Sequence, residues 1–428
     1  MNANILTKTG DLKNRILFTV FLLSIYRFGT YVPIPGIDPN TLQELMNSNQ
    51  KGLLGMFNVF SGGAISRMAI FALGIMPYIS SSIIVQLLTG VSDYFKNLKS
   101  QGEIGRKKIT QITRYGTVLL AIIQGYGVSV GLENSPNIVI NPGLYFKLST
   151  VITILAGTIF LMWLGEQITQ RGIGNGISLI IFSGIVAEIP RALATTFELG
   201  RTGAISALAI VSIFILLILT IIFIVFMERA IRKILINYPK RQMGSKMYGG
   251  ESSHLPLKLN TAGVIPAIFA SALLLLPTTF SNFSLSQSDT LISFTSFFSQ
   301  GKPLYMLVYA AGIIFFCFFY TSIVFNPKET AENLRKYGGY IPGIRPGDRT
   351  ADYIDDILTK LTTIGALYLT LVCLMPEFLI SRYPIPFYLG GTSVLIVVVV
   401  AMDTVTQVQT RLMSSQYESL IKKSKFRS

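Results

Sequence analysis

Ten apolar segments follow one another along the 428-residue chain, and they limit its possible folds more than any other feature. A helix needs about 20 mainly apolar residues to cross the roughly 30 Å hydrocarbon core of a membrane. Backbone groups in lipid must pair within the protein, which favours helices. The pattern therefore predicts an all-α polytopic membrane protein with ten transmembrane helices. The segments are residues 16–32, 68–88, 115–132, 148–164, 174–189, 204–227, 262–280, 304–325, 357–375 and 386–402.

Charged residues are few and unevenly placed. They make up 13% of the chain, yet the formal net charge is +15. If the N-terminus is cytoplasmic, 28 of the 36 lysines and arginines fall on the cytoplasmic side and 7 on the opposite side. Cytoplasmic loops of membrane proteins carry such an excess. The bias predicts that both termini are cytoplasmic and that a positive surface there faces an anionic partner.

Two segments depart from a regular span. Residues 68–88 contain Gly74 and Pro77, which interrupt a helix, so we expect a short half-helix, a break and then a span. Residues 174–189 open on the glycine-rich sequence Arg171-Gly-Ile-Gly-Asn-Gly. That sequence lacks the lysine and hydroxyl residue of a phosphate-binding loop. It predicts a tight cytoplasmic turn.

Two predicted cytoplasmic loops, residues 228–259 and 326–356, are unusually long. Loops beyond about 12–15 residues are usually functional or disordered. Patterned apolar residues and turn sequences in both loops predict ordered projections. The composition leaves two interpretations open: the loops dock a soluble partner, or they are basic loops that only fix the topology.

The predicted membrane interior is almost free of ionisable side chains. Arg27, Glu188, Lys360 and Asp403 lie near segment ends, where a long side chain can reach the interface. A solute transporter or proton pump normally carries ionisable coupling residues near the bilayer midplane. A secondary solute transporter is therefore the alternative function, and it lacks that feature here.

The sequence contains no catalytic or metal-binding constellation, so we expect neither an enzyme nor a cofactor. His254 lies in a basic loop without cysteine or carboxylate partners at metal-binding spacing. Cys317 and Cys373 lie in apolar segments and are interpreted as small buried hydrophobic residues.

Isoleucines recur at helical spacing in several segments. Ile79 and Ile83 are four residues apart, as are Ile181 and Ile185, so each pair shares a helix face. An apolar constriction blocks ions because water does not wet it. The spacing alone fits either such a constriction or ordinary contact with lipid.

Long stretches of the chain resemble the SecY family, the channel subunits of bacterial preprotein translocase. The resemblance runs from the first segment to the C-terminal tail. The matching stretches are Gly74-Ile-Met-Pro-Tyr-Ile-Ser-Ser-Ser-Ile-Ile, Met162-Trp-Leu-Gly-Glu-Gln-Ile-Thr, Arg171-Gly-Ile-Gly-Asn-Gly-Ile-Ser, His254-Leu-Pro-Leu-Lys, Ala262-Gly-Val-Ile-Pro-Ala-Ile-Phe-Ala-Ser, Tyr340-Ile-Pro-Gly-Ile-Arg-Pro-Gly and Ser414-Ser-Gln-Tyr-Glu-Ser.

The resemblance implies two inverted halves of five spans around a central pore, residues 1–200 and 201–428. It implies a channel that carries unfolded preproteins across the plasma membrane and releases membrane segments laterally into it. The implied pore ring consists of Ile79, Ile83, Ile181, Ile185, Ile268 and Ile396. The implied plug is residues 58–70, with a Gly62-Gly63 hinge; its site residues are Ser61, Gly62, Gly63 and Arg67.

The resemblance further implies a lateral gate between the second and seventh spans, which weak hydrogen bonds hold closed. Its polar members are Ser81, Ser82, Gln86, Asn260 and Thr261. The two long loops resemble a docking site for the ribosome and the SecA motor ATPase. The implied docking residues are Arg241, Lys246, Arg345 and Arg349.

Other partners follow from the same resemblance. They are the SecE and SecG subunits, preprotein signal sequences and membrane lipid. One departure affects the first docking loop: some family members carry a basic pair just before the Tyr248 position, where this chain reads Ser245-Lys246. The missing charge weakens the expected contribution of that loop tip.

Overall fold

The computed structural model describes residues 10–38, 58, 61–133, 138–203, 206–238, 241–243, 246–248, 252–283, 302–382 and 391–425. Most of these residues are helical. The helices are α2 (Gly10–Gly29), α5 (Met76–Val91), α6 (Asp93–Ser100), α7 (Glu103–Glu133), α8 (Leu144–Arg171), α9 (Gly176–Arg201), α10 (Ala207–Arg229), α11 (Ile265–Phe283), α13 (Pro303–Val324), α14 (Pro327–Lys336), α15 (Asp348–Arg382) and α16 (Gly391–Lys425). The strands are β1 (Ile231–Asn237), β2 (Arg241–Met243), β3 (Lys246–Tyr248) and β4 (Ser252–Lys258).

Each of the ten predicted segments falls on a helix. In chain order these are α2, α5, α7, α8, α9, α10, α11, α13, α15 and α16. Within the described residues, seven helices are long and apolar enough to cross a membrane, whereas α5 and the apolar part of α11 are shorter. Residues 204–205 and 386–390, which begin two predicted segments, lie outside the described residues. The prediction of a helical polytopic chain is confirmed, with seven candidate spans.

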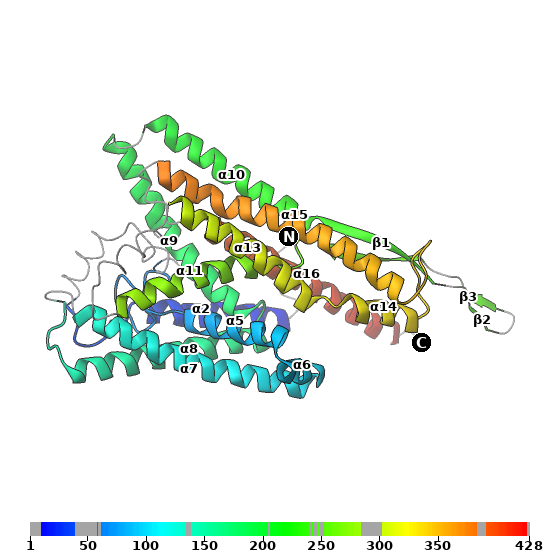
Figure 1. Cartoon of the computed structure of the whole chain (residues 1–428), viewed down its shortest axis with the longest axis horizontal. Helices are drawn as coiled ribbons and strands as arrows, with labels where there is room; N and C mark the ends of the chain where they lie inside the picture. Colours follow the sequence, from blue (N-terminus) through cyan, green and yellow to red (C-terminus); the bar gives the residue numbers. More distant parts are fainter. Residues whose placement is uncertain are drawn as a thin grey trace.

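The helices pack around one central apolar core. α7 and α8 lie side by side along one edge, while α10, α13 and α15 run together along the other (Figure 1). Between them, α5 contacts both α7 and α11, and α9 contacts α2, α8 and α16. The largest cluster of buried residues draws on all of these helices except α7. Elements far apart in the sequence therefore meet at the centre of the molecule.

Residues 61–75 form a series of turns instead of the expected half-helix, so that prediction is wrong. Gly62, Gly63 and Gly74 adopt positive φ angles of 66°, 81° and 55°, which a helix does not allow. α5 begins only after these turns, and Pro77 lies in its first turn, where the missing N–H has no helical partner to lose. The positive φ angles of these glycines, rather than Pro77, prevent residues 61–75 from forming a regular helix.

The predicted tight turn before the fifth span is confirmed. α8 ends at Arg171, and the side chain of Asn175 caps α9 by accepting a hydrogen bond from the Ile177 N–H, at 3.1 Å. Gly176 lies so close to α8 that a Cβ would meet the carbonyl of Gly165. The glycines allow two consecutive helices to reverse direction in close contact.

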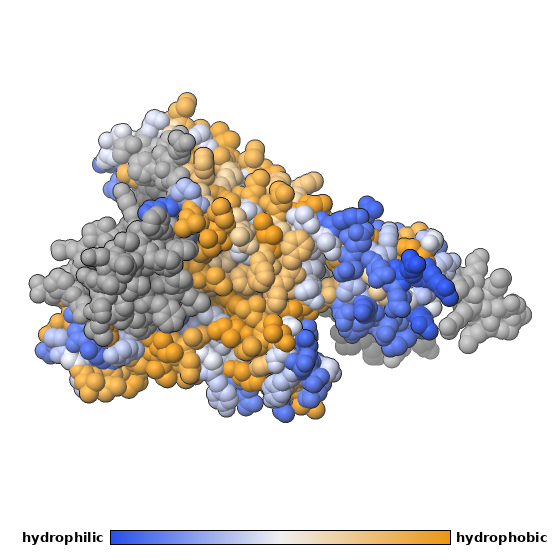
Figure 2. All heavy atoms as spheres, in the orientation of Figure 1, coloured by the Kyte–Doolittle hydropathy of each residue, from blue (hydrophilic) through white to orange (hydrophobic). Residues whose placement is uncertain are grey.

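Both long loops are ordered where the structure describes them, as predicted. β1 pairs with β4 in an antiparallel ribbon, and α14 begins at an Asn326 cap. The backbones of Asn237 and Tyr340 exchange two hydrogen bonds, of 2.9 and 3.0 Å, which join the two loops. α14 lies at the same end of the molecule as the strands, and the strands reach beyond the helices there (Figure 1). Figure 2 shows a hydrophilic surface there, next to a hydrophobic band over the helices.

Candidate functional site

A narrow cavity lies where α5, α9, α11 and α16 meet. It is lined by Ile75, Met76, Ile79, Ile181, Ile268, Ser271 and Ile396. Its volume is ≈ 10 Å³, which is about the room that a single water molecule requires. Four of the six isoleucines that the resemblance implies for a ring therefore meet here, one from each helix.

The other two isoleucines extend the same packing. Ile83 and Ile185 do not line the cavity, but they are 6% and 0% exposed and belong to the central core. Each lies one helical turn beyond a cavity-lining isoleucine, on the same face. The alternative interpretation, in which these isoleucines face lipid, is wrong for the five that are buried, and the half-buried Ile268 lines the cavity.

The turn segment 61–70 packs beside this cavity. A Cβ placed on Gly62 would lie 3.0 Å from the Cα of Gly184, the residue before Ile185. At the other end of the segment, the Ile34 N–H donates to the Met68 carbonyl (2.8 Å) and the Ile70 N–H donates to the Val32 carbonyl (2.9 Å). Positions 59 and 60 of the implied plug lie outside the described residues.

Side chains of α2 hold the start of this segment. The Tyr26 hydroxyl donates to the Ser61 carbonyl at 3.2 Å, and Arg27 Nη1 donates to the Gly62 carbonyl at 2.8 Å. The Arg67 guanidinium stacks on the Tyr31 ring, 4.1 Å from its centroid. A cation over an aromatic face is attracted by the ring quadrupole.

Arg27 and Glu188 do not simply reach the membrane interface, so that prediction is wrong. Arg27 binds the Gly62 carbonyl, and Glu188 is 9% exposed, with its Oε1 beside Gly63. Ionisable groups inside a membrane protein usually face the protein interior and pair there. The sequence did contain a signal, because a charge inside an apolar segment is unusual, but the partners are distant in the chain.

The gate residues are placed differently from the expectation. α5 and α11 contact each other, but the Ser81 hydroxyl donates to the Thr113 carbonyl of α7, at 2.8 Å. Gln86 donates to Ser82 within α5, and Thr261 donates to the nearby Lys258 carbonyl. Among the described residues, none of these bonds joins α5 to α11. The structure therefore does not contain the expected cross-gate hydrogen bonds among its described residues: the bonds of Ser81, Gln86, Asn260 and Thr261 go to other partners.

Asn260 belongs to a buried polar group that the sequence did not indicate. Its Nδ2 donates to Glu228 Oε1 at 2.6 Å, and the Tyr368 hydroxyl donates to the same oxygen at 3.4 Å. Asn260 also bonds both backbone groups of Gly263. The end of α10, the turn before α11 and the middle of α15 are thereby joined at one carboxylate.

The docking residues lie at the hydrophilic end. Arg345 and Arg349 are exposed, in and after the turn that leads into α15, and the Arg345 carbonyl accepts a 3.0 Å bond from Thr350. Arg241 and Lys246 lie in the short β2–β3 pair; their side chains are outside the described set. Below them, Ile234, Leu257, Ile341 and Ile354 form a buried cluster that fixes both loops to α15.

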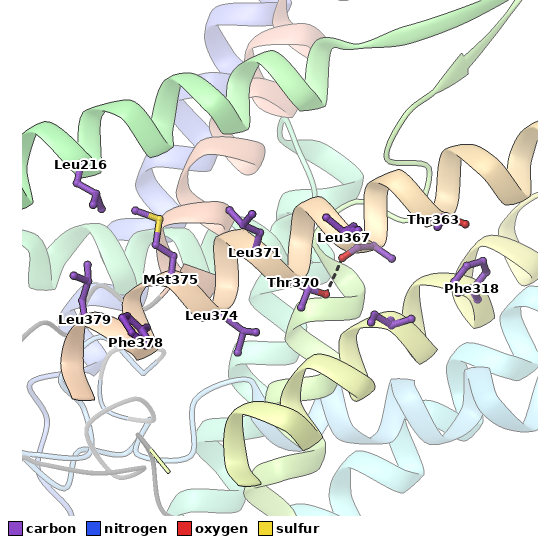
Figure 3. A pocket seen from close by; sticks show the side chains of 12 residues that line it. Leu216, Phe318, Thr363, Leu367, Thr370, Leu371, Leu374, Met375, Phe378 and Leu379 are labelled. Carbon is purple, nitrogen blue, oxygen red and sulfur yellow. Dashed lines mark hydrogen bonds between the residues drawn. The ribbon is translucent and has the colours of Figure 1, made fainter. Parts of the chain in front are cut away.

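An apolar groove of ≈ 680 Å³ lies away from the ring, between α10, α13 and α15. Figure 3 shows its lining side chains, including Leu216, Phe318 and Met375. The Thr370 hydroxyl in the wall of the groove donates its proton to the Ala366 carbonyl, so this proton is not available to a bound molecule. Within the described residues, no group of three or more His, Cys, Asp or Glu residues could hold a metal ion.

Comparisons with known proteins agree with this geometry. The SecY family model matches residues 69–405. The protein translocase subunit SecY of Rickettsia bellii is 55% identical over 432 residues, covering 100% of both chains. That of Escherichia coli K12 is 53% identical over 419 residues, covering 97% of this chain and 95% of the relative.

Two solved structures share the fold. One is a SecY protein whose plug domain is described as stabilising the closed state of the translocation channel and maintaining a membrane seal; its TM-score is 0.65 at 18% identity, covering 93% of this chain and 92% of that one. The other is Sec61 in a canine ribosome–channel complex from the endoplasmic reticulum, with a TM-score of 0.61 at 16% identity and the same coverage. The family match and the full-length identities show that this chain belongs to the SecY family.

Proposed function

We propose that this chain is the protein-conducting channel of a preprotein translocase and that unfolded polypeptides cross the membrane through the isoleucine ring. The carrying observation is the meeting of four isoleucines, from four helices, around a cavity of ≈ 10 Å³. Two of these helices come from each proposed half, residues 1–200 and 201–428. Membership of the SecY family makes the chain a channel subunit rather than an enzyme.

The chemistry of isoleucine suits such a constriction. Apolar walls offer water no hydrogen bonds, so a closed ring stays dry and excludes ions. Hydrophobic contact is non-directional. The ring can therefore close around any side chain that passes, and it presents no polar group that would retain one.

We assign residues 58–70 as the plug, with the Gly62-Gly63 turn as its hinge. Its contacts with α2 and with Gly184, next to the ring, support this assignment. The SecY structure whose plug domain maintains a membrane seal shares the fold of this chain. In the closed channel the plug adds a second barrier beside the ring.

The lateral gate is the contact between α5 and α11. Each of these helices contributes one isoleucine to the cavity, so their separation would open the ring towards lipid. Apolar residues of both helices belong to the central core, and no described hydrogen bond of the five polar gate residues crosses the contact. An apolar signal sequence can replace this packing with its own surface, which supports lateral release of membrane segments.

The joined cytoplasmic loops are the proposed docking platform for the ribosome and the SecA motor, with Arg345 and Arg349 exposed on it. Positive side chains favour polyanionic ribosomal RNA, and attachment would weaken with salt. The Sec61 relative occurs in a ribosome–channel complex, which supports this partner. We place the channel in the plasma membrane with both termini cytoplasmic, alongside SecE and SecG.

Disulfide crosslinking to a stalled preprotein tests the proposal. Ile181→Cys is made in full-length chain whose two native cysteines, Cys317 and Cys373, are replaced by alanine; Ile218→Cys on the exposed face of α10 is the matched control. A preprotein with one cysteine, arrested in transit, should crosslink at position 181 and not at 218. Crosslinking at neither position, or at 218 alone, would overturn passage through the ring.

A further inference from the structure

Arg27 on α2 and Glu188 on α9 are ionisable side chains that the channel proposal leaves unused. Both lie against the same turn, Gly62-Gly63. We propose that Tyr26, Arg27 and Glu188 form a plug latch, a set of positioning residues that holds the plug in its closed place. This inference rests on the assignment of residues 58–70 as the plug.

The first part of the plug latch is a pair of hydrogen bonds to consecutive carbonyls. Tyr26 binds the Ser61 carbonyl at 3.2 Å and Arg27 binds the Gly62 carbonyl at 2.8 Å. Both donors come from neighbouring residues on α2, so the helix presents them as one unit. A hydrogen bond from a charged donor is about twice as strong as a neutral one.

The second part is the shape of the turn. Gly62 and Gly63 have φ angles of 66° and 81°, which other residues rarely adopt. A Cβ on Gly62 would lie 2.8 Å from Arg27 Nη1 and 3.1 Å from the Tyr26 hydroxyl. On Gly63 it would collide with Glu188 Oε1. The side chains of Tyr26, Arg27 and Glu188 therefore pack directly against a backbone without side chains. They contact this turn only when it lies in its closed position.

The third part is the balance of charge. A Cβ on Gly63 would lie 3.3–3.4 Å from the Arg67 guanidinium as well as against Glu188 Oε1, so the cation and the carboxylate approach the same turn. Arg67 Nη1 is buried without a hydrogen-bond partner among the described residues. Tyr31 presents its ring to both Arg67 and Arg27, at 4.1 and 5.5 Å. Charges in a low-dielectric interior interact strongly. Displacement of the plug would separate Arg67 from Glu188 and remove the carbonyl acceptor of Arg27 together.

The test measures how often the plug leaves this position. Ser61 is 3% exposed, so a Ser61→Cys thiol should react slowly with a membrane-impermeant maleimide added outside. The full-length chain, with its native cysteines replaced by alanine, is assembled in its membrane complex. The thiol is labelled in otherwise unchanged channels and in Arg27→Leu, Arg27→Lys and Arg191→Leu variants. Arg191 is an exposed arginine on the same helix as Glu188 and serves as the control.

We expect Arg27→Leu to raise the labelling rate on the order of 10- to 100-fold, the range for loss of a hydrogen bond from a charged donor. Arg27→Lys should restore part of the protection, and Arg191→Leu should change nothing. If Arg27→Leu prevents assembly, Tyr26→Phe removes one hydroxyl only and should raise the rate about 2- to 10-fold.

A stalled preprotein separates failure of the latch from failure of the plug assignment. Transit should displace the plug and expose the Ser61→Cys thiol in channels with an intact latch. If transit raises labelling but Arg27→Leu and Tyr26→Phe do not, the plug latch is wrong and the plug stands. If neither transit nor these variants raise labelling, the plug assignment is wrong, and the latch with it.

Discussion

In the proposed channel, the isoleucine ring and the plug latch are neighbouring barriers with opposite chemistry. Both use α9, which contributes Ile181 to the ring cavity and places Glu188 beside the plug turn. The ring is formed by apolar side chains from four helices around a cavity of ≈ 10 Å³. The latch consists of hydrogen bonds to two carbonyls and of charges around a glycine turn. The helix α9 therefore contributes a residue to each of the two barriers.

The difference follows from what each barrier must do. Hydrophobic contact has no preferred direction, so a ring of isoleucines can seal at many diameters. Hydrogen bonds depend steeply on distance and angle, so the latch holds only one arrangement of the turn. The ring, which must close around any polypeptide, is formed by apolar packing. The latch, which must return the plug to one position, is formed by polar contacts.

The largest expected effect comes from wetting the ring. Ile181→Asn combined with Ile396→Asn should raise ion leak through vesicles on the order of 10²- to 10³-fold, because both apolar walls become hydrated. The matched pair Ile181→Val and Ile396→Val keeps the ring apolar and should change the leak about fourfold or less. Equal leak from the two pairs would contradict an apolar seal.

The polar group at Glu228 should contribute more to the free energy of unfolding than the polar residues on α5 do. Asn260→Ala removes the 2.6 Å bond to Glu228 and leaves a partly buried carboxylate short of a donor, at a cost of about 1.5–3 kcal/mol. Thermal unfolding should show this loss.

Gln86→Leu provides the comparison for Asn260→Ala. Gln86 Oε1 is buried without a hydrogen-bond partner among the described residues, so an apolar replacement should be close to neutral for stability. Thermal unfolding of both variants makes the comparison. An equal loss of stability in the two would contradict the difference between a bonded and an unbonded polar group.

Gly62→Ala tests the fit of the plug turn. The new Cβ would meet Arg27, Gly184 and Tyr26 at 2.8–3.1 Å, in addition to the strain of a positive φ. We expect a leak about tenfold higher, from the roughly 1–2 kcal/mol cost of this conformation. Gly102→Ala is the control, since Gly102 has φ 65° and nothing within 4 Å. A leak of equal size in both variants would contradict the role of the plug turn, because strain outside the plug would then act as strongly as contact with the latch.

Arg345 lies in neither barrier, so its replacement should leave the leak unchanged. Arg345→Gln removes one exposed charge and should alter stability by less than about 0.5 kcal/mol. Ribosome binding should weaken a few-fold, with the slope of log affinity against log salt falling by about 1. Motor-driven transport should fall while membrane insertion of the channel itself persists. Unchanged binding and transport would contradict its docking role.

The sequence predicted the elements whose signal is local. Hydropathy located ten segments that each fall on a helix, seven of them long and apolar enough to span a membrane, because about 20 apolar residues in lipid have few alternatives to a helix. The glycine-rich sequence that starts at Arg171 predicted a turn that the structure contains, and the structure adds the Asn175 cap of α9. The i, i+4 spacing of Ile181 and Ile185 predicted a shared face, and both are buried.

Partners distant in the chain could not be predicted in the same way. Arg27 and Gly62 are 35 residues apart, and Glu228 and Tyr368 are 140 apart. Only the packing of the helices decides which polar groups meet, so interface snorkelling was a reasonable but wrong expectation for Arg27. The half-helix expected at residues 68–75 is absent for a related reason, since Met68 and Gly74 take positive φ angles that the pattern does not encode.

A double-variant cycle on ion leak tests most directly the claim that two independent barriers close the channel. Arg27→Leu acts on the latch and Ile396→Asn acts on the ring, from helices at opposite ends of the chain. If a leak requires both barriers to fail, the fold-increase in the double variant should equal the product of the single increases, within about twofold. A double variant that leaks no more than the leakier single variant would contradict the account, because one barrier alone would then form the seal.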